Sequence, residues 1–203
     1  MKRVFILLMA MLPLMATAQD NTWEMPEKTA TGANPDQKYL AGAVPEVDGK
    51  VAFETTVKAP GKSRKQIYDI VTDYMKKLIK EPNQLEQSRI LLTDSTGFSQ
   101  VVANLQEWLV FKNKPLNLDR TRLFYHLIVD CNDGEATIKM TRIVYLYDEE
   151  RDPQTYVAEE WINDRYGLNR KQTKLARVSG KFRRKTIDRK DYLFRKFEQM
   201  LTQ

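Results

Sequence analysis

The clearest pattern in the chain is a long alternation of apolar and polar residues on both sides of Asp133-Gly134. An Asp-Gly pair between two alternating runs is typical of a two-residue β-turn, because it supplies the positive φ angles that the turn requires. The alternation predicts a β-hairpin over residues 118–147 in which Asn132 faces Glu135. Counting outward from the turn pairs Tyr125 with Arg142 and places an apolar set on one face: Leu123, Leu127, Val129, Cys131, Ala136, Ile138, Met140 and Val144.

Shorter runs predict three further strands, over residues 50–58, 88–93 and 99–111. The first and third runs alternate and have one apolar side, so each of these two strands is expected to bury one face. Residues 155–180 show no dominant period. We expect a connector there, with a short helix around residues 158–162.

Two helices are predicted by their start signals and their apolar stripes. Ser63 is followed three residues later by Gln66, which forms a capping box ahead of a helix that extends to about Lys80. A second amphipathic pattern over about residues 187–201 predicts a C-terminal helix with Asp188 as its cap.

The predicted order is strand, helix, four antiparallel strands and a terminal helix. A sheet with one apolar face needs a cover, and two amphipathic helices supply one. We therefore expect an α+β, two-layer domain over residues 49–203, with an antiparallel sheet covered on one face by two helices.

The first eighteen residues have the features of a cleavable secretory signal peptide. Lys2 and Arg3 precede an apolar run that is too short to span a bilayer, and Ala16-Thr17-Ala18 supplies the small residues of a cleavage site. We expect an exported mature chain, periplasmic or extracellular, that begins near Gln19. Residues 19–48 are rich in Pro, Ala, Gly and charge, which predicts a flexible linker.

Cysteine content and charge distribution add two constraints. Cys131 is the only cysteine, so no internal disulfide can form and the thiol is expected to be a small core residue. Residues 165–196 contain thirteen Lys or Arg and two acids, which leaves the rest of the mature chain net acidic. This segment predicts contact with a membrane surface or an anionic envelope polymer, or else a solvated face that balances the acidic remainder. Nucleic acid is not an expected partner of an exported protein.

Alternation places two charged residues, Glu107 and Arg142, on the otherwise apolar face. If Phe111 pairs with Thr121, both residues line up with Tyr125 across three adjacent strands. A carboxylate, a phenol and a guanidinium in such a row could orient a polar headgroup or the carboxylate of a partner. The alternative, which we favour, is a structural ion pair with Arg142 along the Tyr125 ring.

The other ionisable residues do not form a catalytic constellation. His126 is the only histidine, so a multi-histidine metal site is impossible. Glu159 and Glu160 are adjacent and point in different directions in either a helix or a strand, which makes them unsuitable for paired acid and base chemistry. The sequence has no Gly-rich phosphate loop and no nucleophile elbow. We expect neither a cofactor nor an enzymatic activity.

Several short blocks, in order after Gly49-Lys50-Val51, resemble the domain of unknown function 4468 family. They are Leu118–Arg122, Lys139–Ile143, Ala158–Ile162 and Gly180–Arg183. The resemblance covers about residues 49–201 and implies an exported bacterial domain with a fold similar to one half of the TATA-binding protein. It implies no activity, because none is established for the family, and it brings no catalytic residues.

Together these observations predict a non-catalytic exported binding domain. Its ligand, apolar or anionic, is expected between the sheet and the C-terminal helix, as in helix-grip proteins of the same layout, or else on the basic segment. The alternative is a structural or protein-interaction module of the cell envelope. A cavity of several hundred Å³ beneath the helices would favour a carrier, whereas a filled core would favour recognition at the surface.

Overall fold

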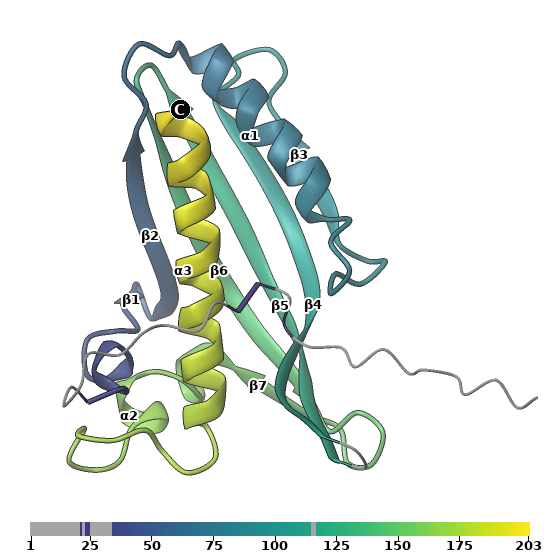
Figure 1. The fold of residues 1–203 in the computed structure, drawn as a ribbon, viewed down its shortest axis with the longest axis vertical. Coiled ribbons are helices and arrows are strands. Elements are labelled where there is room, and N and C mark those ends of the chain that lie inside the picture. The colour runs from purple at the N-terminus through teal and green to yellow at the C-terminus, as the bar shows by residue number, and fades with distance from the viewer. Residues whose placement is uncertain (1–20, 22, 25–33, 115–116) are drawn as a thin grey trace, which may run out of the picture.

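The fold is described from a computed structural model that covers residues 21, 23–24, 34–114 and 117–203 (Figure 1). The predicted signal peptide, residues 1–18, lies outside the described residues. Within those residues, seven strands form one antiparallel sheet in the order β1-β2-β6-β5-β4-β3, and β7 pairs with β6. The strands are β1 (Glu46–Val47), β2 (Lys50–Lys58), β3 (Arg89–Thr93), β4 (Gln100–Lys114), β5 (Asn117–Asn132), β6 (Glu135–Tyr147) and β7 (Gln154–Val157).

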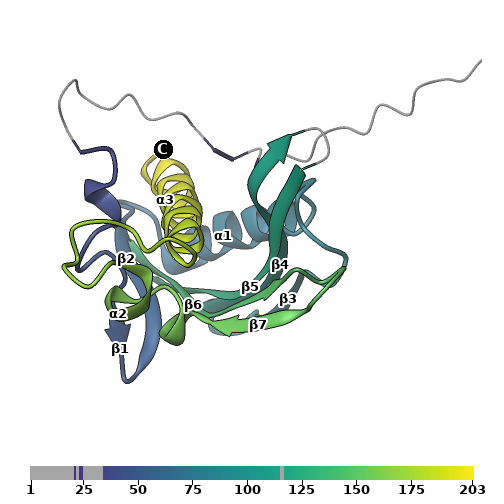
Figure 2. The same ribbon diagram turned by 90° about the horizontal axis from the view of Figure 1, so that it is seen from below.

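The two long helices lie together on the concave side of the curved sheet (Figure 2). The helices are α1 (Arg64–Leu78), α2 (Asp164–Gly167) and α3 (Gly180–Thr202), with 3-10 turns η1 (Gln37–Tyr39) and η2 (Ala158–Glu160). The predicted α+β class and two-layer arrangement are confirmed, with β1, β7 and α2 added to the predicted order. No helix in the described part of the chain is long and apolar enough to cross a bilayer.

The central hairpin of β5 and β6 forms around the predicted turn. Gly134 has a φ of 78°, whereas Asp133 does not have a positive φ, so the turn forms at the predicted place with one of the two expected positive φ angles. The predicted pairs from Asn132 and Glu135 as far as Leu127 and Met140 are confirmed. The side chains of the predicted apolar face are buried along this part of the hairpin.

Beyond these pairs, a β-bulge at Arg142 changes the register. Leu123 faces Tyr145, so the predicted pairs of Leu123 with Val144 and of Tyr125 with Arg142 are wrong. An extra residue in one strand reverses which side chains point inward, and Arg142 is accordingly exposed with a φ of 54°. Sequence alternation alone does not reveal such an insertion.

Direct packing of α3 on the sheet fills the space between them. The Phe182 ring of α3 lies 4.6 Å from the Phe111 ring and 5.2 Å from the Tyr145 ring, measured between centroids. Further along α3, Leu193 and Phe197 have no exposed surface. Edge and tilted contacts of this kind are favourable ring geometries, so a ligand beneath α3 would have to displace them.

α3 begins at Gly180, well before the predicted start near Ile187. The early turns were missed because their buried positions include the fully buried Arg183, which interrupts the apolar period. Asp188 is therefore not a cap. It lies inside α3 and accepts a hydrogen bond from the Tyr39 hydroxyl at 2.8 Å.

Part of the predicted linker is folded against the domain. η1 and β1 both lie in this segment, and Tyr39 and Val44 are buried. Arg183 of α3 donates hydrogen bonds to the backbone carbonyls of Tyr39 at 2.6 Å and Leu40 at 2.7 Å. The buried Arg183 guanidinium thus supplies hydrogen-bond donors that this segment lacks in its own sequence.

The predicted connector contains β7, η2 and α2. The expected helix at residues 158–162 is a 3-10 turn, η2, whose Glu159 accepts a hydrogen bond from the Val51 backbone N–H at 2.9 Å. β7 was not predicted, because a four-residue strand is too short to show a period.

The capping box of α1 is present as predicted and gives a first test of the fold. The Ser63 side chain accepts from the Gln66 backbone N–H, and the Gln66 side chain accepts from the Ser63 N–H at 2.8 Å. We expect Ser63→Ala to lower the free energy of unfolding by about 1 kcal/mol in urea titrations, because a helix-end N–H loses its partner. Ser95→Ala, at an exposed turn position, is the control and should change it by less than about 0.5 kcal/mol. Equal losses would contradict the role of the box.

Candidate functional site

Two of the three predicted site residues, Glu107 and Tyr125, meet in the core. Both side chains have no exposed surface, and the Tyr125 hydroxyl donates to Glu107 Oε1 at 2.7 Å. They are diagonal neighbours, because Leu109 pairs with Thr121 where Phe111 was expected. The predicted register of β4 was therefore wrong by two residues, which leaves the face assignment unchanged.

The third member of this cluster is Arg189 of α3 and not Arg142. Arg189 Nε lies 2.8 Å from Glu107 Oε1, and neither side chain has any exposed surface. Arg142 sits in the bulge of β6 and points to solvent. A signal for Arg189 exists in the sequence, since it lies seven residues after Phe182 and four before Leu193, on the apolar stripe of the helix.

Four further side chains surround the ion pair. Asn83 donates to the second oxygen of Glu107, and Glu81 lies 3.3 Å from Arg189 Nη2. The rings of Trp23 and Tyr192 lie 5.4 Å and 5.3 Å from the guanidinium of Arg189. The cluster is thus a buried ion pair enclosed by neighbouring side chains, but its arginine is Arg189, whereas the ion pair that we favoured from the sequence used Arg142.

The electrostatics of the cluster follow from burial and pairing. Burial is the largest single effect and lowers the pKa of Arg189, but the combined attraction of Glu107, Tyr125 and Glu81 outweighs it and raises the pKa above its ordinary value. Burial, reinforced by the nearby charge of Glu107, raises the pKa of the Tyr125 hydroxyl well above its ordinary value. Arg189 therefore stays charged and the Tyr125 phenol stays neutral, so the phenol can donate its hydrogen bond to Glu107 as observed.

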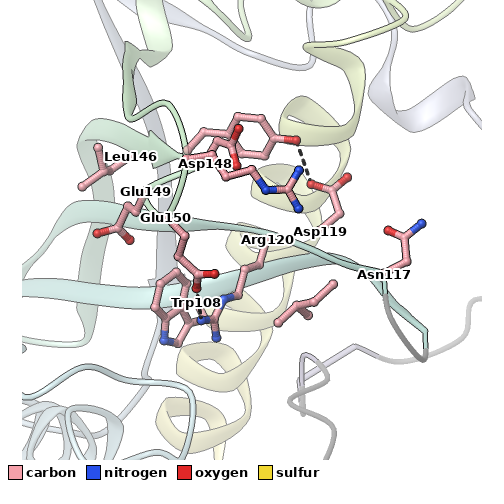
Figure 3. A pocket seen from close by; sticks show the side chains of 11 residues that line it. Trp108, Asn117, Asp119, Arg120, Leu146, Asp148, Glu149 and Glu150 are labelled. Carbon is pink, nitrogen blue, oxygen red and sulfur yellow. Dashed lines mark hydrogen bonds and ion pairs between the residues drawn. The ribbon is translucent and has the colours of Figure 1, made fainter.

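An open pocket of about 330 Å³ lies at the far end of the long strands (Figure 3). Trp108 of β4 and Arg120 of β5 form one wall, where the guanidinium lies 3.7 Å from the centroid of the indole ring. The turn after β6 forms the other wall and contributes Glu149 and Glu150. The pocket thus combines an aromatic surface with carboxylates.

The charges around this pocket are paired with one another. Arg120 lies 3.4 Å from Glu150. Asp119 accepts from the Tyr147 hydroxyl at 2.9 Å and lies 2.7 Å from Lys181 Nζ. A ligand would have to open these pairs before it could use their charges, so the pocket does not provide a prepared charged site.

The remaining ionisable residues have structural surroundings. Cys131 is buried as predicted, and burial raises the pKa of its thiol to about 12, which keeps it unreactive. His126 is half-buried on the outer face of the sheet. In the described part of the chain, no three His, Cys, Asp or Glu side chains are grouped so that they could hold a metal ion.

The basic segment divides into a paired part and an unpaired part. Six cations at the beginning and middle of α3 lie against carboxylates: Lys181, Arg183, Arg184, Lys185, Arg189 and Lys190. Upstream, five exposed cations have no carboxylate within ion-pair distance among the described residues: Arg165, Arg170, Lys171, Lys174 and Arg177. The excess positive charge of the sequence is therefore concentrated in residues 165–178, here called the basic hairpin.

The basic hairpin has a defined backbone. Leu168 and Leu175 form a β-bridge at its base. At the tip, the Asn169 side chain accepts from the backbone N–H groups of Thr173 at 2.9 Å and Lys174 at 3.2 Å. These hydrogen bonds satisfy backbone N–H groups of the turn and fix its conformation. In Figure 1 the hairpin is the loop beside α2.

Comparison with known proteins shows the family. The family model "Domain of unknown function (DUF4468) with TBP-like fold" matches residues 53–146. A crystal structure of a DUF4468 family protein from Bacteroides ovatus is 40% identical, covers 83% of this chain and 96% of that chain, and has a TM-score of 0.77. The chain belongs to the DUF4468 family. The resemblance to this family that the sequence indicated is thus confirmed.

A second solved structure supports the fold of this DUF4468 protein. A TBP-like protein from Parabacteroides distasonis is 20% identical, with a TM-score of 0.61 over 78% of this chain and 96% of that chain. No curated protein matches the chain. The family is one of unknown function, so the comparisons establish the TBP-like fold and indicate no catalytic class.

Arg142, which the sequence placed in the cluster, and Arg189, which the structure places there, can be compared directly by mutation. We expect Arg189→Met to lower the free energy of unfolding by about 3–5 kcal/mol, because Glu107 is left charged and unpaired in the core. Arg142→Met should change it by less than about 0.5 kcal/mol, because Arg142 is exposed. Urea unfolding of both variants gives the comparison.

A second substitution separates loss of the ion pair from loss of packing. Glu107→Gln in the Arg189→Met background removes the unpaired charge and should recover part of the lost stability. If Arg142→Met proved as damaging as Arg189→Met, the assignment of Arg189 to the cluster would be wrong.

Proposed function

We propose that this DUF4468 domain is a non-catalytic exported binding module that attaches to anionic phospholipid headgroups through the basic hairpin. The observation that carries the proposal is the set of five exposed hairpin cations without carboxylate partners in the described structure. Most other cations of the same segment are neutralised within the fold. Free charge that is concentrated in one place is available to an external anion.

The surroundings of these cations favour a membrane surface over a dissolved polyanion. Tyr166 and Val178 are 41% and 56% exposed. The Ser179 hydroxyl donates to the Tyr166 carbonyl at 2.5 Å, which brings both residues to the base of the hairpin. Apolar and aromatic side chains beside cations fit the boundary between headgroups and acyl chains, whereas an anionic polymer offers no apolar phase.

The size of the effect is sufficient for reversible attachment. Each Lys or Arg close to an anionic bilayer contributes about 1 kcal/mol, and the contribution falls off within a Debye length. Five cations on a structured hairpin therefore support weak, salt-sensitive binding. Binding at the surface also agrees with the filled space beneath α3, where Phe182 packs directly on the sheet.

Removal of the hairpin-tip charges tests the proposal. The triple variant Arg170→Gln, Lys171→Gln, Lys174→Gln should bind vesicles that contain phosphatidylglycerol about 100-fold more weakly than the unaltered protein, because three of the five cations are lost. The control is Lys77→Gln, Lys80→Gln, Lys112→Gln, which removes the same charge from exposed positions elsewhere. Co-sedimentation over a range of salt concentrations measures the binding.

The unaltered protein and the control should bind anionic vesicles at low salt and should not bind pure phosphatidylcholine vesicles. Equal binding of the triple variant and the control would contradict the proposal. Retention on an immobilised sulfated polysaccharide without any vesicle binding would show that the hairpin recognises an anionic polymer and would also overturn it.

A further inference from the structure

The outer edge of β2 is open over most of its length. β1 pairs with β2 only at Lys50 and Val51, whereas β6 pairs with β2 as far as Lys58. In the described structure no strand covers the other side of residues 53–58, and β2 forms the margin of the sheet in Figure 1. An open edge presents backbone N–H and C=O groups that a further strand can bind.

Two hydrogen bonds show which residues of β2 point outward. Ala59 N–H donates to the Gly134 carbonyl at 2.7 Å, on the side of β6, and Ala52 N–H donates to the Pro45 carbonyl at 3.2 Å, on the open side. Backbone direction alternates along a strand. The N–H and C=O groups that point away from the sheet therefore belong to Glu54, Thr56 and Lys58.

The side chains of these three residues form an ordered row on the outer face of the sheet. Glu54 lies 2.7 Å from Lys139, and Lys58 pairs with Glu135. Between them, the Thr56 hydroxyl lies 3.1 Å from that of Thr137. The edge thus carries one negative and one positive residue, spaced evenly on either side of a neutral threonine.

We propose that the β2 edge binds the β2 edge of a second copy of this chain, antiparallel, about a two-fold axis at Thr56. In that register Glu54 lies opposite the partner's Lys58, and Lys58 lies opposite the partner's Glu54. The outward N–H and C=O groups then form about six interchain hydrogen bonds. A C2 axis makes the interface self-complementary, which is the commonest form of association between identical chains.

Charge pattern selects this register over its neighbours. An axis at Glu54 or at Lys58 would place like charges directly opposite each other, which is destabilising in a sheet. With the axis at Thr56, the charges across four strands alternate in sign, in the order Lys139, Glu54, the partner's Lys58, the partner's Glu135. Pro60 ends the ladder, because it has no N–H to donate.

A groove of about 600 Å³ runs beside the same edge, between β2 and α3. It is lined by Thr55 and Val57 of β2 and by Phe194 and Arg195 of α3. Phe194 is only partly buried. A second β2 at the edge would close the open side of this groove and cover Phe194, which adds apolar contact to the backbone pairing.

Charge reversal provides the test, because each single variant repels itself and attracts the other. Glu54→Lys and Lys58→Glu should each weaken self-association of the full chain about tenfold or more, since both symmetric pairs become repulsive. An equimolar mixture of the two variants should associate as heterodimers, and the double variant should associate more strongly than either single variant. Sedimentation velocity and native mass spectrometry at micromolar concentrations measure each state.

A backbone variant tests the pairing independently of charge. Thr56→Pro removes an N–H that points away from β6, so circular dichroism should show an intact fold while dimers are lost. A monomer at all concentrations up to the high micromolar range would overturn the proposal. Dimers that persist in both single charge variants, or a mixture that fails to associate, would also overturn it. Misfolding of the charge variants cannot imitate the expected result, because mixing does not rescue a misfolded chain.

Discussion

The ion pair between Glu107 and Arg189 determines how α3 lies on the sheet. Both groups are fully buried at a separation of 2.8 Å, and a buried charge without its partner is strongly unfavourable. Apolar packing alone tolerates sliding of a helix along a sheet, whereas a directional pair accepts one position. The ring contacts of Phe182 and the hydrogen bond between Tyr145 and Thr186 at 2.7 Å then fit the same position.

The placement of α3 decides where the charge of the protein is exposed. Residues along α3 meet acids from distant parts of the chain, among them Asp119 from β5 and Asp36 beside η1. These pairs neutralise much of the basic segment within the fold. What remains is the basic hairpin just before α3, whose cations have no acid within ion-pair distance in the described structure, because the adjacent Asp164 pairs with Arg183 instead.

The two proposed surfaces lie on different parts of the molecule and use different physics. The basic hairpin depends on unpaired charge and is sensitive to salt. The β2 edge depends on backbone groups whose direction is set by the pairing of β2 with β6, and on a charge order that suits a second copy. A tethered domain that also pairs with itself would gain avidity, because two basic hairpins would reach one surface.

Local patterns were enough to predict much of the architecture and part of the candidate site. The turn at Gly134, the capping box at Ser63 and the inward faces of β2, β4 and β5 depend on residues close together in sequence, and all are present. Glu107 and Tyr125 were placed correctly for the same reason. The two-residue error in the register of β4 did not change the predicted faces, because a shift of two residues leaves each side chain on the same face.

Only the tertiary structure decided the partner of Glu107, the fold of the segment before β2 and the cations that stay unpaired. One extra residue in β6 turned Arg142 outward, and a helix position 82 residues away brought Arg189 to the same carboxylate. The buried Arg183 also concealed the start of α3, and it donates hydrogen bonds to the carbonyls of Tyr39 and Leu40. Sequence period reports which way a side chain points along its own element, but which elements meet, and at what offset, is set by packing between segments that are remote in the chain.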